Sequence, residues 1–531
     1  MSVKVHLHWG RIIDDYDGTY VYDVKAAREQ VALSPQVMDA LHTDGAKAID
    51  KLCALGESSR NPDWNNATNR IVLPLLQSLV DYTVFPCSLH KLGNPLVVRG
   101  CIKLLKSITR FGRPSPFSYE YGHLCFRILL IAFDYCVLKL SEHHGDWVTE
   151  ATQPKNQLLK EGLAPMLSKA VSELIDECMI DGDEGGYSRF IASLPWTDSY
   201  TGALVKPGDI RLLTQVLDED RKHFLIFLRS NYSLRLSALL YTMFQVMHRT
   251  PPTTANRPFV QAFSRVYLRA LLLVPGYPSR WGWQHQYVID ISKEYESTGQ
   301  RLDAEDSKLV LRAYTDRLTL LSDSSPLHPR ATSPLAVELL QYASPLVSDG
   351  CETLIPAVIR ATMRCISDDL KGNNSEVAPA DLVDACIQLF GHLEHLVQHL
   401  AERSEATRGA IVKEAFDAFM DKNLFDILEY ISSKPSPQGE ELRDGKNIPD
   451  LGFLPPNFCF VPEEHLRVIF FAPNGSDCSR RFRIPTLSLM QVSARDVYNF
   501  SHNRVLSITR ASIACSNSLF RFVLDSSMPS A

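Results

Sequence analysis

The chain has no closely spaced cysteines and none of the common phosphate-binding or nucleophile motifs. Of its twelve cysteines, the two nearest in sequence are Cys125 and Cys136, 11 positions apart, so there is no C-x-x-C zinc knuckle. No G-x-x-x-x-G-K-[ST], G-x-S-x-G or G-x-G-x-x-G segment occurs either. We therefore expect free cysteines packed in a protein core, a reducing compartment and no cofactor.

Uninterrupted apolar runs of membrane-spanning length are also missing. The longest run, 124–140, contains Arg127 and Asp134, whereas a bilayer span needs about 20 predominantly apolar residues. This segment is typical of a buried core helix. The first nine residues alternate between apolar and polar side chains, which is not the pattern of a signal peptide. We expect no membrane span and a cytoplasmic or nuclear location.

A strong excess of positive charge is absent as well. The 531 residues carry a net charge of −6, with a pI near 6.3, which argues against broad binding to nucleic acid. Hydrophobic residues make up 45% of the chain and charged residues 22%, so a sizeable core can form. The length allows several domains or one long repeat array. A protein partner is therefore favoured over nucleic acid.

The first 25 residues predict a β-hairpin. Side chains alternate between apolar and polar over 2–9, which is strand periodicity. A second strand is expected over 19–24, after the turn dipeptide Asp17-Gly18. We therefore assign 1–25 to a small N-terminal hairpin.

His6 and His8 lie on one face of the first predicted strand. This H-x-H spacing resembles the motif on the first strand of amidohydrolase-type metal enzymes, and the resemblance implies a metal site. Those enzymes take further ligands from later strands of a β/α barrel, and no strand–helix alternation follows here. The alternative is two polar side chains on the solvated face of a hairpin.

The pattern is helical from 26 to 432. Apolar residues recur at spacings of three and four, and prolines stand at or near first helical positions. These prolines are Pro35, Pro95, Pro258, Pro334 and Pro379. We predict an all-α fold, a multi-helix array or α-solenoid-like bundle of roughly thirteen to fifteen helices. Possible sub-boundaries lie near 194–208, 249–258 and 322–334.

The end of the helical body carries a resemblance to a repeat family. The run Asn-Leu-Phe-Asp-Ile-Leu-Glu-Tyr-Ile at 423–431 resembles the last helix of an armadillo-type repeat. Over one or two helices, this resemblance implies an α-solenoid. Proline and glycine then mark a predicted linker at 433–457. The segment 458–531 has no Lys or Glu from 466 onward, and we predict an irregular or flexible tail there.

A stripe of positive charge is the most informative feature for function. Its members, at spacings of four and three, are Arg99, Lys103, Lys106, Arg110 and Arg113, and we call them the basic stripe. No acidic residue occurs over 82–119, whereas solvated helix faces usually mix both signs. One interpretation is a docking surface for an acidic protein partner. The other is a plain solvated face, or one that pairs with acids of a neighbouring helix, for which Glu173, Asp176 and Glu177 are candidates.

A second candidate surface lies at 275–283. Three aromatic residues and an arginine are concentrated there: Tyr277, Arg280, Trp281 and Trp283. Aromatic and arginine side chains dominate the energetics of protein interfaces. They also fill the corners between helices, so both roles remain open.

Asp368 and Asp369 offer a different metal hypothesis. With the polar residues after them, they resemble the acidic metal motif of all-α terpenoid synthases, but Gly372 stands where a carboxylate is needed. Every candidate metal cluster therefore lacks a ligand, and we expect no bound metal. The sequence favours a non-enzymatic interaction scaffold or adaptor. The alternative is a metal-dependent enzyme that uses His6 and His8 or the Asp368 region.

Overall fold

The computed structural model describes most of the helical body and part of the N-terminus. The described residues are 5–16, 20, 35–58, 67, 70–83, 85–108, 115–141, 143–153, 163–180, 205–230, 236–248, 253, 256–273, 287–288, 290–291, 303–319, 331–372, 377–401, 405–420, 427 and 430. Within them the chain forms sixteen α-helices and one two-stranded sheet, which confirms the all-α fold with a short N-terminal hairpin.

The helices of the described residues are 7 to 23 residues long. The first eight are α2 (Pro35–Glu57), α4 (Leu73–Tyr82), α5 (Pro86–Leu92), α6 (Pro95–Ile108), α7 (Glu120–Leu140), α8 (His144–Ala151), α10 (Ala164–Ile180) and α12 (Pro207–Glu219). The next eight are α13 (Arg221–Ser230), α14 (Ser237–His248), α15 (Arg257–Leu273), α17 (Ala304–Thr319), α18 (Ser333–Ala343), α19 (Ile355–Leu370), α20 (Pro379–Ala401) and α21 (Glu405–Met420). Short 3-10 turns are η1 (Pro116–Ser118), η5 (Ser344–Leu346) and η6 (Glu352–Leu354).

Prolines mark helix starts as the sequence predicted. α2, α6 and α20 begin at a proline, and α15 and α18 have one as their second residue. Proline lacks the N–H that would have no partner in a first turn, and its fixed φ suits the helix. At α18, the Thr332 side chain also accepts a hydrogen bond from the Leu335 backbone N–H. Local chemistry therefore sets these boundaries.

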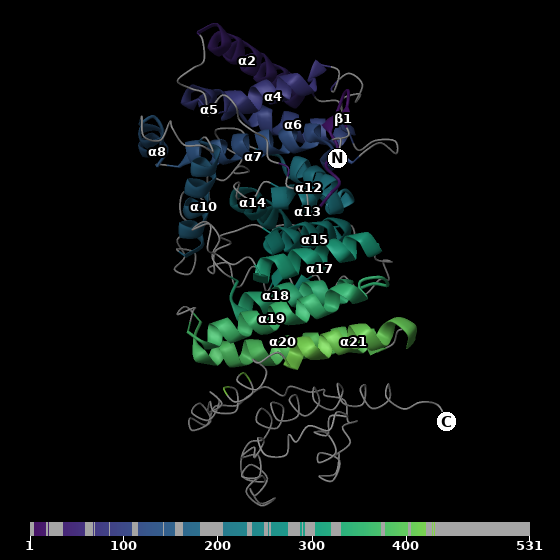
Figure 1. The fold of residues 1–531 in the computed structure, drawn as a ribbon. Coiled ribbons are helices and arrows are strands. Elements are labelled where there is room, and N and C mark those ends of the chain that lie inside the picture. The colour runs from purple at the N-terminus through teal and green to yellow at the C-terminus, as the bar shows by residue number, and fades with distance from the viewer. Residues whose placement is uncertain are drawn as a thin grey trace, which may run out of the picture.

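Most of the helices stack in chain order from α2 to α21, and α8 and α10 lie at one side of the stack (Figure 1). At one end α2 packs on α4 and α6, and α6 packs on α7 and α12. Toward the other end α15, α17, α19 and α21 contact one another in succession, while α18 packs on α20. Each helix thus buries its apolar face mainly against helices near it in sequence, which is the packing logic of repeat arrays.

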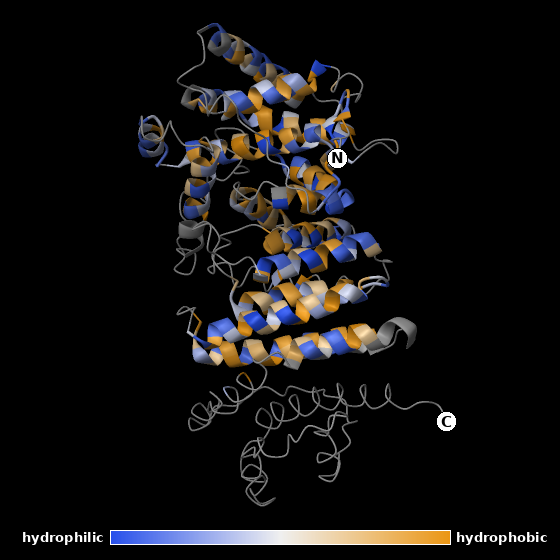
Figure 2. Ribbon diagram, in the orientation of Figure 1, coloured by the Kyte–Doolittle hydropathy of each residue, from blue (hydrophilic) through white to orange (hydrophobic). Residues whose placement is uncertain are grey.

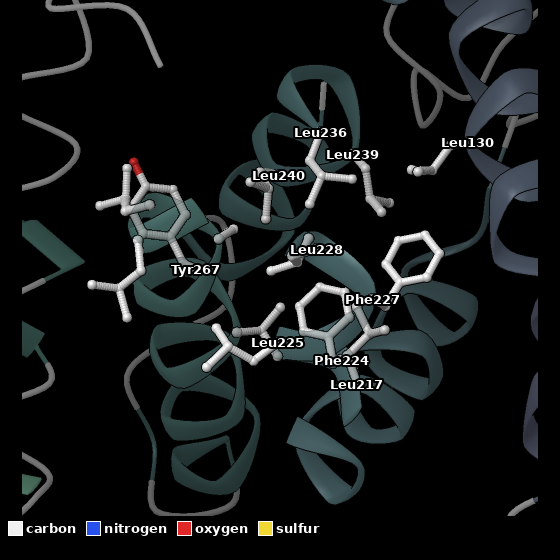
Figure 3. Packing of buried hydrophobic residues seen from close by; sticks show 14 of the residues in the cluster. Leu130, Leu217, Phe224, Leu225, Phe227, Leu228, Leu236, Leu239, Leu240 and Tyr267 are labelled. Atoms are coloured by element: carbon white, nitrogen blue, oxygen red, sulfur yellow. The ribbon is translucent and has the colours of Figure 1, made fainter. Parts of the chain in front are cut away.

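The core runs through the whole stack. Apolar and polar residues alternate around most helices, so each carries both an orange and a blue surface (Figure 2). α14 is an exception, because every residue over 237–247 is buried. Figure 3 shows part of this core, with Phe224 and Phe227 of α13 and Leu239 and Leu240 of α14 among its buried side chains.

α7 confirms the prediction of a buried core helix. Among the described residues it is the one helix long and apolar enough to cross a membrane, and 94% of that window is buried inside the fold. The described cysteines behave as expected too. All seven are free thiols, and six of them are buried. Burial raises the pKa of the Cys136 thiol to about 12, so it stays protonated.

The turn of the N-terminal hairpin lies elsewhere than predicted. β1 (Val5–His6) pairs antiparallel with β2 (Gly10–Arg11), so the turn falls at 7–9, inside the stretch expected to be one strand. Gly10 adopts φ +77°, which the tight turn requires. The segment expected as the second strand, 19–24, lies almost entirely outside the described residues, as do the linker at 433–457 and the tail at 458–531.

The possible sub-boundaries remain predictions. Residues 194–204 lie outside the described residues, and α12 begins within 194–208, at Pro207. α15 begins within 249–258, and α18 begins within 322–334.

Candidate functional site

Two residues of the basic stripe face α12. The Nε of Arg99 lies 3.6 Å from Oδ2 of Asp209. The Nζ of Lys106 lies 3.4 Å from Oε2 of Glu219. Both side chains are about one-fifth exposed, with relative accessibilities of 19% and 21%, so the pairs sit at the rim of the α6–α12 contact.

Lys103 contacts the end of α2 instead. Its Nζ donates hydrogen bonds to the carbonyl oxygens of Leu55 at 3.2 Å and Gly56 at 3.0 Å, and also to that of Ser58. The last carbonyls of a helix lack intrahelical donors and carry partial negative charge, so an ammonium group stabilises them. Partial burial lowers the pKa of Lys103, and nearby Asp209 opposes that shift.

The described part of the basic stripe therefore lies in contacts among α2, α6 and α12. This arrangement favours the ion-pair interpretation for Arg99 and Lys106, whereas Lys103 binds backbone carbonyls, and the acids differ from the candidates. Glu173 pairs with Lys169 of its own helix at 3.6 Å, and the side chains of Asp176 and Glu177 lie outside the described set. Arg110 and Arg113 lie outside the described residues too.

His6 and His8 are engaged in the hairpin turn. The Nδ1 of His6 accepts hydrogen bonds from the backbone N–H groups of His8 at 3.1 Å and Trp9 at 3.2 Å. The His8 ring stacks on Tyr121, with centroids 6.2 Å apart. Burial lowers the pKa of His8, and His6 adds to the effect. In this arrangement one imidazole nitrogen stabilises the turn rather than offering itself to a metal.

Asp369 stabilises the start of α18. Its Oδ2 accepts hydrogen bonds from the backbone N–H of Ser333 at 2.6 Å and from the Ser333 hydroxyl at 2.7 Å. The carboxylate is buried at the end of α19, so it acts as an N-terminal cap supplied by a neighbouring helix. Among the described residues no group of three or more His, Cys, Asp or Glu side chains is placed to hold a metal ion.

A buried charged network, which the sequence reasoning missed, joins α12, α13, α15 and α17. Oδ2 of Asp306 accepts from Nε of Arg221 at 2.6 Å and from Nη2 of Arg269 at 2.8 Å. Arg265 makes two parallel hydrogen bonds to Asp218, at 2.7 and 2.6 Å. Arg269 is only 1% exposed, and burial lowers its pKa, but Tyr342 and then Asp306 outweigh this effect, so the pKa is raised. Such a network holds helices in register.

The last part of the hairpin and the residues after it form a second feature that the sequence did not reveal. We call 9–16 the N-terminal strap. Its backbone forms hydrogen bonds with η1 and with the first turn of α7. The Ile13 N–H donates to the Ser118 carbonyl at 2.8 Å, and the Tyr121 N–H donates to the Trp9 carbonyl at 3.1 Å. Three of its side chains, Trp9, Ile13 and Tyr16, are buried.

Tyr16 anchors the far end of the strap. Its hydroxyl donates to Oδ2 of Asp316 at 3.1 Å, and the guanidinium of Arg229 lies 4.3 Å from the ring centroid. Arg229 also donates to the same carboxylate at 2.6 Å. Burial and then Asp316 raise the pKa of Tyr16 well above its ordinary value, so the phenol stays protonated. A separation of 300 positions hides this contact from any local sequence pattern.

The aromatic and arginine segment at 275–283, with Tyr277, Arg280, Trp281 and Trp283, lies outside the described residues. Comparison with models of known protein families gives no match, and none of the curated proteins matches the sequence.

Proposed function

We propose that this chain is a non-enzymatic protein-interaction scaffold or adaptor, built as an armadillo-like α-solenoid. The stacking of helices in chain order carries the proposal. An array in which each helix contacts its near neighbours presents long lateral faces, and repeat proteins use such faces to bind partners. The fold by itself does not assign a function, so the proposal needs a direct binding test.

An acidic protein is the partner class that we propose for the basic stripe. The pairs Arg99–Asp209 and Lys106–Glu219 are partly exposed, and exposed ion pairs contribute only about 0–1 kcal/mol. Carboxylates of a partner can therefore replace Asp209 and Glu219 as the partners of Arg99 and Lys106 at little cost in free energy. Nucleic acid is a poorer candidate, because aromatic side chains that stack on bases are not interleaved with the stripe.

Affinity capture with the full chain, followed by lysine cross-linking and mass spectrometry, tests the scaffold proposal. We expect a stoichiometric partner whose cross-links fall on exposed lysines of separate helices, such as Lys47, Lys169 and Lys413. Cross-links confined to a single helix, or no stoichiometric partner at all, would contradict a scaffold role.

The stripe is tested by Lys106→Glu. We expect this variant to lose capture of the acidic partner while its unfolding midpoint changes little. Lys169→Glu is a matched control, because Lys169 is also a lysine in a surface ion pair, but on α10. If Lys106→Glu and Lys169→Glu capture the partner equally well, the basic stripe is not part of the binding surface.

A further inference from the structure

We propose that the face covered by the N-terminal strap is the peptide-binding face of this protein. Its ligand is an extended peptide of the same chemistry as the strap: two large apolar side chains followed by a tyrosine with acidic neighbours. The strap occupies the face in the free protein and leaves when this peptide binds. The inference rests on the proposed scaffold function and names the partner class for one face.

The position of the strap is the first observation. Its Trp9 and Ile13 contact the entrance of α7, and its Tyr16 reaches α13 and α17. The strap therefore crosses helices that lie at successive levels of the stack, with β1 beside the stack at the level of α6 (Figure 1). A peptide bound along the side of a helical array follows such a path.

The backbone contacts of the strap are the second observation. Ile12 forms an antiparallel bridge with Tyr119, and the adjacent Ile13 N–H donates to the Ser118 carbonyl. Main-chain pairing gives affinity without regard to side-chain identity, and pockets for alternate side chains add specificity. Another extended segment with similar side chains can therefore make the same bonds.

The seat of Tyr16 is the third observation. Arg229 and Asp316 are 2.6 Å apart and bind each other as well as Tyr16. When Tyr16 is displaced, Arg229 and Asp316 remain paired with each other. Displacement therefore leaves no buried charge without a partner. Asp14 and Asp15 stay exposed beside Tyr16, so acidic neighbours of an incoming tyrosine are tolerated. The seat is thus preformed for a tyrosine in an acidic segment.

A labelled peptide tests the exchange. A fluorescein-labelled synthetic peptide copying residues 5–16 is titrated with the full chain, and binding is followed by fluorescence anisotropy. The wild-type chain should bind weakly because its own strap competes. Tyr16→Ala in the chain removes the competing anchor, and we expect the apparent Kd to fall about tenfold or more. The peptide with Tyr16→Ala should not bind either chain.

Two further variants keep the test decisive. Tyr16→Phe retains the ring beneath Arg229 but removes the hydroxyl, so this chain should bind the peptide with intermediate affinity. Adding Arg229→Ala to the Tyr16→Ala chain should abolish binding. Circular dichroism verifies that each variant is folded, and if Tyr16→Ala does not fold, Tyr16→Phe carries the test by having to bind more tightly than the wild type.

Three outcomes would overturn the proposal. In the first, folded Tyr16→Ala and Tyr16→Phe chains bind the peptide no more tightly than the wild type. In the second, the peptide with Tyr16→Ala binds as well as the original. In the third, light scattering shows a dimer of the wild-type chain that dissociates on Tyr16→Ala, which assigns the face to the strap of a second copy. If cross-linking still finds a partner on other helices, the scaffold function stands while this inference fails.

Discussion

Single buried ionisable residues set much of the expected pH behaviour. Asp134 lies in the middle of α7, and burial raises the pKa of its carboxyl to about 8, although a hydrogen bond with Ser168 opposes the shift. At neutral pH this carboxyl is therefore mostly protonated, and it behaves as a polar but uncharged core group. Glu338 of α18 shows the same effect more weakly, because burial raises its pKa to about 7.

Asp134→Asn should flatten the dependence of stability on pH. The folded-state pKa of Asp134 lies above its unfolded value, so the folded protein binds more protons between about pH 4 and 8. The free energy of unfolding of the wild type therefore falls as pH rises through this window, by a contribution on the order of 5 kcal/mol. Urea denaturation should show the Asp134→Asn variant more stable than wild type at pH 9 and nearly equal at pH 4. A constant difference across this range would show that Asp134 does not titrate as described.

Asp306 is the residue on which the charged network depends. Asp306→Ala leaves Arg269 buried without its carboxylate, and breaking a buried pair typically costs about 3–5 kcal/mol. Chemical denaturation measures the loss. Glu305→Ala, at the next position but exposed, is the matched control and should change stability by about 0.5 kcal/mol or less. Equal effects of the two substitutions would mean that the network contributes little.

At the scale of the elements, helix ends are stabilised by side chains from other helices. Lys103 of α6 donates to the last carbonyls of α2, and Asp369 of α19 accepts from the first residue of α18. These contacts join the end of one helix to the body of another. Lys103 of the basic stripe and Asp369 of the Asp368-Asp369 pair therefore both have structural roles.

Lys103→Met should loosen the contact between α2 and α6. The substitution keeps most of the aliphatic stem but removes the donor, and the partly buried last carbonyls of α2 lose about 1–3 kcal/mol of stabilisation. Hydrogen exchange with mass spectrometry should show faster exchange over the last turn of α2. Lys47→Met on the exposed face of the same helix is the control and should leave the exchange unchanged. Unchanged exchange in the Lys103 variant would exclude the capping role.

Element boundaries were easier to predict than element contacts. Prolines at first turns located five helix starts, because proline acts on the backbone of its own turn. The single strand predicted over 2–9 was wrong, because alternation over these residues is equally compatible with one strand or with two short strands. The structure resolves this through Gly10 and the His6 side chain, whose Nδ1 holds the turn.

For the whole molecule, stacking in chain order implies that stability is local. In an array where helices contact near neighbours, a cavity weakens the helices around it and leaves distant ones protected. The charged network and the N-terminal strap couple helices that lie further apart, because each joins several levels of the stack.

A pair of core substitutions tests this locality. Ile359→Ala on α19 and Ile102→Ala on α6 remove the same number of atoms from fully buried positions, at a cost of about 2–5 kcal/mol each. Hydrogen exchange should speed up over 304–420 in the first variant and over 35–140 in the second. Uniform acceleration along the chain in both variants would show that the stack unfolds as one cooperative unit.

The sequence by itself determined the all-α class, the helix starts at prolines, the buried character of α7 and the packing of the described cysteines. Each of these depends on periodicity or backbone chemistry within a few turns, so a local pattern is sufficient. The tertiary structure decided which charges meet. Lys106 and Glu219 are separated by 113 positions, and Tyr16 and Asp316 by 300. Such pairings depend on which segments come together in the folded chain, and the amino-acid pattern of either segment alone does not indicate its neighbour.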